Sequence, residues 1–278
     1  MDARAAARAL LAWYAEAGAD EAIGHDPINR FANPRAVPAV PRRSTPPVAS
    51  VLAATALAAT GRSMPAEGPV AAARSVALAA GSLEELRTAL MAFDGCALKV
   101  TATNTVFADG VAGAPVMIVG EAPGADEDRA GKPFVGLSGQ LLDRMLASVG
   151  LDRRRNVYIS NVLPWRPPGN RNPTEGEMGA CLAFIQRHIE LAAPKVLVVV
   201  GGTSAKALLD RREGITRLRG RWFDWQGPSG GAVVPTLATY HPAYLLRSPA
   251  QKASAWKDLL ALKRRLTEAG IDPVAGGE

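Results

Sequence analysis

Four short runs of hydrophobic, largely β-branched residues recur through the last two thirds of the chain. They are PVMIVG (115–120), NVYISN (156–161), KVLVVVGG (195–202) and VVPTLATYHP (233–242). Segments with hydrophobic residues at helical spacing follow them, at 139–150, 173–193, 203–212 and around 262–266. Strands that alternate with helices predict an α/β fold, here a three-layer sandwich whose central four-stranded parallel sheet is flanked by helices.

The part of the chain before this alternation has a different composition. Leu10, Leu11, Trp13 and Tyr14 have helical spacing and predict an N-terminal helical segment within residues 1–30. Residues 31–81 are rich in Pro, Ala, Ser and Arg and nearly free of aromatic residues, so we predict a flexible linker, with a short helix at 51–59 as an option. Ser82 is suited to cap a helix and marks the start of the main domain, 82–270, before a disordered tail at 271–278.

The net charge and the cysteine content indicate which partners and which compartment the protein is suited to. The chain has 32 Lys plus Arg against 26 Asp plus Glu, and the resulting net charge of +6 attracts polyanions such as nucleic acid. Two cysteines, Cys96 and Cys181, are too few for a disulfide framework and fit a reducing compartment. The chain has no secretory signal and no apolar run of eighteen residues, so we expect a cytoplasmic, nucleoid-associated protein of bacterial type.

Polar residues gather where the predicted strands end, which is where ligands bind in parallel sheets. The first strand leads into GEAPGADED (120–128) and GKPFVG (131–136), whose Gly and Pro residues force a turn that exposes backbone N–H groups. This turn is neither a Walker loop nor a dinucleotide fingerprint. Its carboxylates are equally consistent with ordinary charge at a helix N-terminus.

The second predicted strand ends in Asn161, and the last one ends in the run Thr239-Tyr240-His241-Pro242. The side-chain amide of Asn161 offers a donor beside an acceptor, which matches the edge of a pyrimidine base, although a capping role is the simpler alternative. Pro242 fixes the backbone after His241, whose imidazole could hydrogen-bond a leaving base as it becomes an anion. Lys132, Arg166, Asn170, Arg171 and Arg247 could contact phosphate groups, or could simply be surface residues.

In this order and spacing, the motifs GEAPGADED, GKPFVG, NVLPWRPPGNR and HPAYLLR strongly resemble the uracil-DNA glycosylase superfamily, and above all its family-four, thermophile-type branch. The resemblance covers about residues 82–266. It implies an enzyme that flips uracil out of DNA and hydrolyses its glycosidic bond, with free uracil and abasic DNA as products.

The resemblance also assigns roles to single residues. Glu121 and Ala122 correspond to the floor of the uracil pocket, Phe134 to the aromatic that stacks on uracil, and Asn161 to the amide that reads the base. Glu127 corresponds to the acidic residue near the sugar, and His241 to the histidine near uracil O2. We therefore count Glu127, His241 and Glu121 as catalytic candidates. No lysine occupies a nucleophile position in the motifs, so we expect a monofunctional enzyme that uses water, and we expect a monomer.

The chain departs from this branch at the iron–sulfur cluster that the resemblance implies. Two of the four cluster cysteines are retained as Cys96 and Cys181, whereas Phe93 and Trp165 replace the other two. Two cysteines cannot supply four thiolates, so we expect neither a cluster nor another metal, and we expect packing between the segment near Cys96 and the loop near Trp165. The alternative function is a module that binds uracil or abasic DNA without catalysis.

Overall fold

The computed structural model describes residues 68–271. The predicted N-terminal helix, most of the predicted linker and the tail beyond residue 271 therefore lie outside the described residues. None of the described helices is long and apolar enough to cross a membrane.

The described residues build a sheet of six strands in the order β1-β3-β2-β4-β6-β5. The four inner strands are parallel and confirm the predicted four-stranded core: β2 (Val116–Gly120), β3 (Val157–Asn161), β4 (Val196–Val200) and β6 (Val234–Thr239). The prediction missed one antiparallel strand at each edge, β1 (Asp109–Gly110) beside β3 and β5 (Trp222–Trp225) beside β6.

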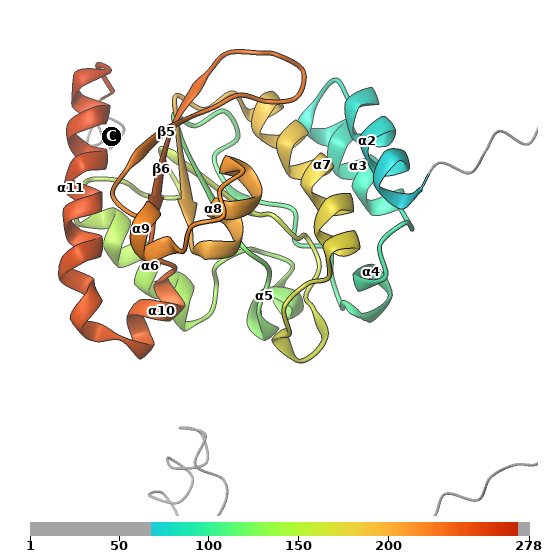
Figure 1. Ribbon diagram of the computed structural model, residues 1–278, viewed down its shortest axis with the longest axis horizontal. Coiled ribbons are helices and arrows are strands. Elements are labelled where there is room, and N and C mark those ends of the chain that lie inside the picture. The colour runs from blue at the N-terminus through green and yellow to red at the C-terminus, as the bar shows by residue number, and fades with distance from the viewer. Residues whose placement is uncertain (1–67, 272–278) are drawn as a thin grey trace, which may run out of the picture. The chain divides into compact units, whose positions relative to one another are not determined.

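The inner strands are buried on both faces, and their side chains alternate between two hydrophobic clusters. In β2, Met117 and Val119 belong to one cluster, whereas Val116 and Ile118 belong to the other. This period of two places one layer of helices on each side of the sheet, as Figure 1 shows. The predicted three-layer sandwich is confirmed.

Helices of the first layer contribute to the cluster around Met117: α2 (Pro69–Ala79), α3 (Leu83–Ala92), α4 (Leu98–Thr101), α7 (Glu175–Ala192), α8 (Gly202–Leu209) and α9 (Ile215–Leu218). The second layer consists of α6 (Leu137–Ala147) and α11 (Lys252–Glu268). Two short helices, α5 (Ala125–Ala130) and α10 (Pro242–Arg247), follow the carboxyl ends of β2 and β6. Single 3₁₀ turns occur at Pro168–Asn170 and Pro249–Gln251.

Helix α2 corrects the predicted linker, which extended to residue 81. Ala73 and Ala77 of α2 are fully buried, and α2 packs along α7. Arg187 of α7 fixes the end of α2 by donating two hydrogen bonds to the carbonyl oxygen of Ala80 (3.0 and 2.8 Å). The alanine-rich sequence resembled a low-complexity linker, but alanine is the best helix former and its small side chain lets two helices approach closely. The expected cap of α3 is present, since Ser82 Oγ accepts from the Glu85 N–H.

Candidate active site

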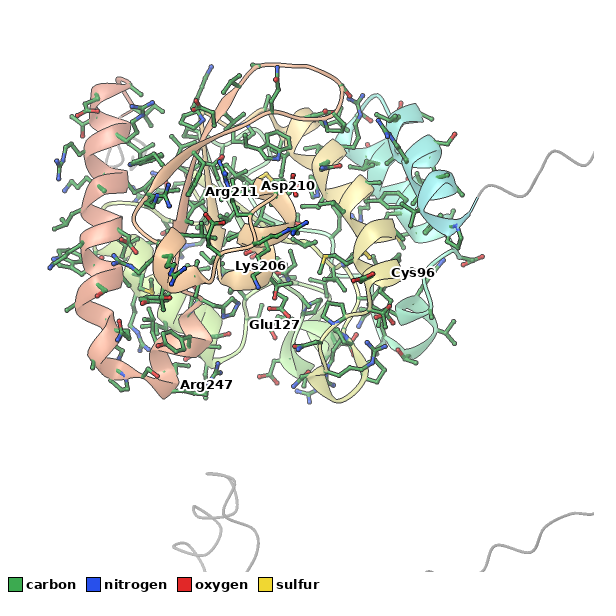
Figure 2. The ribbon with its side chains drawn as sticks, viewed as in Figure 1. Cys96, Glu127, Lys206, Asp210, Arg211 and Arg247 are labelled. Atoms are coloured by element: carbon green, nitrogen blue, oxygen red, sulfur yellow. The ribbon has the colours of Figure 1, made fainter. Side chains whose placement is uncertain are left out.

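The carboxyl ends of β2, β3 and β6 surround a cavity of about 420 Å³. Glu127 and Arg247 belong to its lining, and Figure 2 shows them on α5 and α10 at the same end of the sheet. The lining includes nine of the eleven residues predicted for the site: Glu121, Ala122, Glu127, Phe134, Asn161, Asn170, Arg171, His241 and Arg247. The structure therefore brings together four motifs that are far apart in the sequence.

Asn161 and Phe134 meet at the end of β2, over Gly120. Both side chains are buried, with 4% exposure each. A Cβ atom at Gly120 would collide with the Asn161 Oδ1 atom and with the Phe134 ring, so only glycine allows both residues to occupy this position. No described residue hydrogen-bonds to Asn161 Nδ2 or Oδ1. The pocket wall thus carries a buried amide whose donor and acceptor both lack a hydrogen-bond partner in the described part of the chain.

Phe134 has an unusual backbone conformation that a second residue holds in place. Its φ angle is +54°, in the left-handed region that bulky residues avoid. Arg153 donates to the carbonyl oxygens of Phe134 (2.7 Å) and Pro133 (3.1 Å), and its guanidinium is itself paired with Asp109 and Asp143. Sequence reasoning missed Arg153 because it lies in a different segment from the motif that it anchors.

Glu127 connects the two turns of the first motif region. Its Oε1 atom accepts from the N–H groups of Val135 and Gly136 (2.9 Å each), and its Oε2 atom accepts from Gly124 (3.1 Å). Three of the roughly four acceptor positions of the carboxylate are therefore occupied by backbone. The N–H group of Gly124 is accordingly bound within the protein, so it is not one of the exposed N–H groups that the turn was expected to present.

His241 caps α10 and faces Phe134. Its Nδ1 atom accepts a hydrogen bond from the Ala243 N–H (3.2 Å), and the two ring centroids of Phe134 and His241 are 5.4 Å apart. Burial, together with the nearby positive charge of Arg247, lowers the pKa of His241 to about 4. At neutral pH the imidazole is therefore neutral, and because Nδ1 is an acceptor, the proton is on Nε2.

A buried ionic cluster supports β6 two residues before His241. Asp258 of α11 accepts from the Thr239 hydroxyl (2.7 Å) and is paired with Arg219. Arg219 also lies over the ring of Tyr240, which lines the cavity. Neither Asp258 nor Arg219 belongs to a recognisable motif, so no sequence signal identifies them.

The loop between β3 and α7 is held by an ion pair. Arg171 donates two hydrogen bonds to Glu177 (2.9 and 2.7 Å), and this pairing lowers the pKa of Glu177 to about 2. Asn170 accepts from Arg166 Nε (2.9 Å). Arg171 and Asn170 thus reach the cavity, whereas Arg166 contacts the loop itself and is absent from the lining.

Lys132 is also absent from the lining. Its ammonium group lies 3.3 Å from Asp109, and its side chain is 61% exposed. His188, the other histidine among the described residues, is buried against Phe107 and Tyr158. His188 therefore has a packing role, and of the two described histidines it is His241 that lines the pocket.

The resemblance places four residues at the positions of the cluster cysteines, and all four belong to the hydrophobic cluster on the α7 side of the sheet. Phe93, Cys96, Trp165 and Cys181 are all buried in the same hydrophobic cluster, which confirms the expected packing of the Cys96 segment against the Trp165 loop. The Phe93 ring packs against Phe184, with 5.2 Å between centroids. Two aromatic side chains therefore fill volume at positions where a cluster would need thiolates, and the donor set does not fit a four-thiolate cluster.

Comparison with known proteins agrees with the geometry. The sequence profile of the uracil-DNA glycosylase superfamily matches residues 107–260. A type-4 uracil-DNA glycosylase of Pyrobaculum aerophilum is 41% identical over 181 residues, which are 64% of this chain and 91% of that protein. Type-4 uracil-DNA glycosylases of Thermotoga maritima (43% identical, 55% of this chain and 77% of the relative) and Archaeoglobus fulgidus (41%, 60% and 85%) are also similar.

Proposed function

Because the chain belongs to the uracil-DNA glycosylase superfamily, we propose that it hydrolyses the N-glycosidic bond of a flipped-out uracil in DNA and leaves an abasic site. The observation that carries this proposal is the buried Asn161 amide, which has no hydrogen-bond partner within residues 68–271 and lines a cavity beside Phe134 and His241. A base that offers one carbonyl and one N–H would satisfy both amide atoms. Cytosine presents its acceptor and donor on this edge in the reverse order, so it would pair with the amide only if the amide turned over.

Phe134 supports the proposal as a stacking surface for the base. Arg153 holds the backbone of Phe134 through a hydrogen bond to its carbonyl oxygen, and the ring lies close to Gly120. A base that leaves the duplex loses a few kcal/mol of stacking and pairing free energy. Stacking on a fixed aromatic ring recovers about 1–3 kcal/mol of that loss.

His241 is suited to stabilise the departing uracil. When the glycosidic bond breaks, the base takes the electron pair and becomes an anion. A neutral imidazole with its proton on Nε2 donates a hydrogen bond to the developing negative charge, and Nδ1 remains bound to the Ala243 N–H throughout. The role of Glu127 is then mainly to hold the turns at 124 and 135–136, with about one acceptor position left for water or the sugar.

Water is the proposed nucleophile. No lysine occurs among the described residues that line the cavity, so a covalent Schiff base on an amine is not supported. Arg247, Arg171 and Asn170 lie at the cavity and are suited to contact phosphates on either side of the flipped nucleotide. Lys132 and Arg166 lie outside the lining, and we assign them at most contacts to more distant phosphates. We further propose that the enzyme acts as a monomer and without an iron–sulfur cluster.

An oligonucleotide with one uracil tests the proposal. Incubation with the protein followed by alkali should cut the strand at that position, and a matched strand with thymine should remain intact. A protein that shifts the uracil strand in a binding gel without making it sensitive to alkali would instead be the non-catalytic binding module.

A further inference from the structure

Cys96 and Cys181 are in contact although 85 positions separate them in the sequence. Their Sγ atoms are 4.0 Å apart, and the side chains are 3% and 1% exposed. Cys96 precedes α4 and Cys181 belongs to α7. Figure 2 shows Cys96 beside α7, well apart from Arg247 of the proposed active site. These two thiols are the only cysteines in the whole sequence.

The surroundings of the pair favour reaction between the two sulfur atoms over metal binding. Phe93 and Trp165 supply carbon atoms rather than ligands, and no group of three or more His, Cys, Asp or Glu residues suited to a metal occurs within residues 68–271. The two sulfur atoms are in van der Waals contact, and a disulfide needs them to approach from 4.0 Å to about 2.05 Å.

The two thiols differ in acidity. The hydrogen bond from Cys181 lowers the pKa of Cys96 to about 7, and the same contact, with burial, raises the pKa of Cys181. Cys96 thus supplies a thiolate near neutral pH while Cys181 keeps its proton. Cys96 is therefore the more acidic thiol of the contacting pair and the better candidate for the attacking sulfur.

We propose that Cys96 and Cys181 form a reversible intramolecular disulfide when the protein meets a small peroxide. The Cys96 thiolate attacks one oxygen of hydrogen peroxide, whose O–O bond breaks, and forms a sulfenic acid; the hydroxide that leaves takes a proton from solvent and becomes the first water. Cys181 then attacks the Cys96 sulfur, its proton leaves with the hydroxyl as a second water, and the S–S bond forms. Both sulfur atoms are oxidised by one electron each, and the peroxide is reduced to two waters. A dithiol reductant reverses the reaction.

The crosslink would join the α3–α4 connection to α7 without touching the cavity. Closing a loop of this length restricts the unfolded chain, so the oxidised protein should have a higher Tm, by about 5 °C or more. Cleavage of uracil-containing DNA, where the proposed function holds, should change little. The proposal does not depend on that function, because its readouts are covalent structure and Tm.

The experiment uses the full chain, reduced and then exposed to hydrogen peroxide. We expect the intact mass to fall by two hydrogens, no thiol to react with N-ethylmaleimide after denaturation, and a linked peptide that contains Cys96 and Cys181. Dithiothreitol should restore two reactive thiols and the lower Tm. Cys181→Ser, which retains the size of the side chain, should show no loss of two hydrogens and no rise in Tm.

Three outcomes would overturn the proposal. Two reactive thiols after peroxide treatment of folded protein would show that the pair does not crosslink, and a disulfide only between separate chains would show that the thiols react elsewhere. Stoichiometric iron in protein isolated without oxygen would show that the thiols are ligands instead.

Discussion

The backbone N–H of Ala243 donates a hydrogen bond to Nδ1 of His241 over 3.2 Å. This contact caps α10 and at the same time fixes the proton of the neutral ring on Nε2. One residue therefore has two separable roles, one in stability and one in the proposed chemistry.

Two substitutions separate these roles. In His241→Asn the side-chain oxygen can still accept from Ala243, but the ring N–H is removed, whereas His241→Ala removes both groups. Both variants should lower kcat by about 10²–10³-fold, because a donor to the developing anion is missing. Only His241→Ala should also lose about 1 kcal/mol of folding free energy. Single-turnover cleavage and urea unfolding of the three proteins measure the two effects, and equal stability of both variants would contradict the capping role.

Substitution of Asn161 should have opposite effects on stability and on activity. Its buried amide has no described partner in the protein, so Asn161→Leu should leave the free energy of unfolding unchanged or raise it by about 1–2 kcal/mol. Uracil cleavage should fall by at least about 10²-fold, since the base loses both hydrogen bonds. Chemical denaturation and cleavage rates test the pair of effects. Strong destabilisation of the variant would show that the amide serves the fold.

Substitution of Arg153 should lower activity although this residue does not line the cavity. Arg153→Ala removes the hydrogen bonds to Pro133 and Phe134 and should lower kcat/KM by about tenfold or more, because Phe134 can then leave its left-handed backbone conformation. The adjacent Arg154 pairs with Asp152 in an exposed position and provides the control. Arg154→Ala should retain near wild-type kcat/KM, and similar losses in both variants would contradict the positioning role.

Arg247 predicts an effect on DNA affinity rather than on chemistry. It is exposed at the cavity rim, and Arg247→Ala should reduce the slope of log Kd against log salt by about 0.7–0.9, because the variant neutralises one phosphate fewer. Arg264, exposed on α11 and absent from the lining, is the matched control. Fluorescence anisotropy over a range of salt concentrations measures both slopes. An unchanged slope for Arg247→Ala would exclude the phosphate contact.

His188 predicts a pH dependence of stability. Complete burial lowers its pKa to about 3, so between about pH 6.5 and pH 3 the unfolded chain binds a proton that the folded protein does not. Stability must therefore fall as pH is lowered through this window, by about 1.4 kcal/mol per unit from this residue. His188→Gln can still accept from Tyr158 and should reduce the slope between pH 6.5 and 4. Urea unfolding of both proteins at several pH values measures this slope. Parallel curves of stability against pH for wild type and variant would contradict the role of His188.

The inner sheet was predictable because each strand is a continuous hydrophobic run followed by a helix, a pattern that is local in the sequence. The edge strands could not be predicted in this way, because β1 consists only of Asp109 and Gly110 and β5 is only partly buried. Helix α2 was missed since its buried face consists of alanines that carry little hydrophobic signal.

The candidate site divides in the same way. Asn161, Phe134 and His241 belong to short motifs, so the sequence identified them together with their neighbours. The residues that position them belong to no motif. Arg153 hydrogen-bonds to Phe134, and Asp258 hydrogen-bonds to Thr239, each from a distant part of the sequence. The positive φ angle of Phe134 likewise depends on contacts that only the folded chain creates.

Cleavage in the presence of borohydride tests the central claim most directly. Wild-type protein incubated with a single-uracil oligonucleotide should release one uracil per strand, and mass spectrometry should find a reduced abasic sugar on the strand and no protein attached to it. Intact oligonucleotide after prolonged incubation, or a covalent adduct between protein and DNA in place of the reduced sugar, would contradict hydrolysis in this pocket.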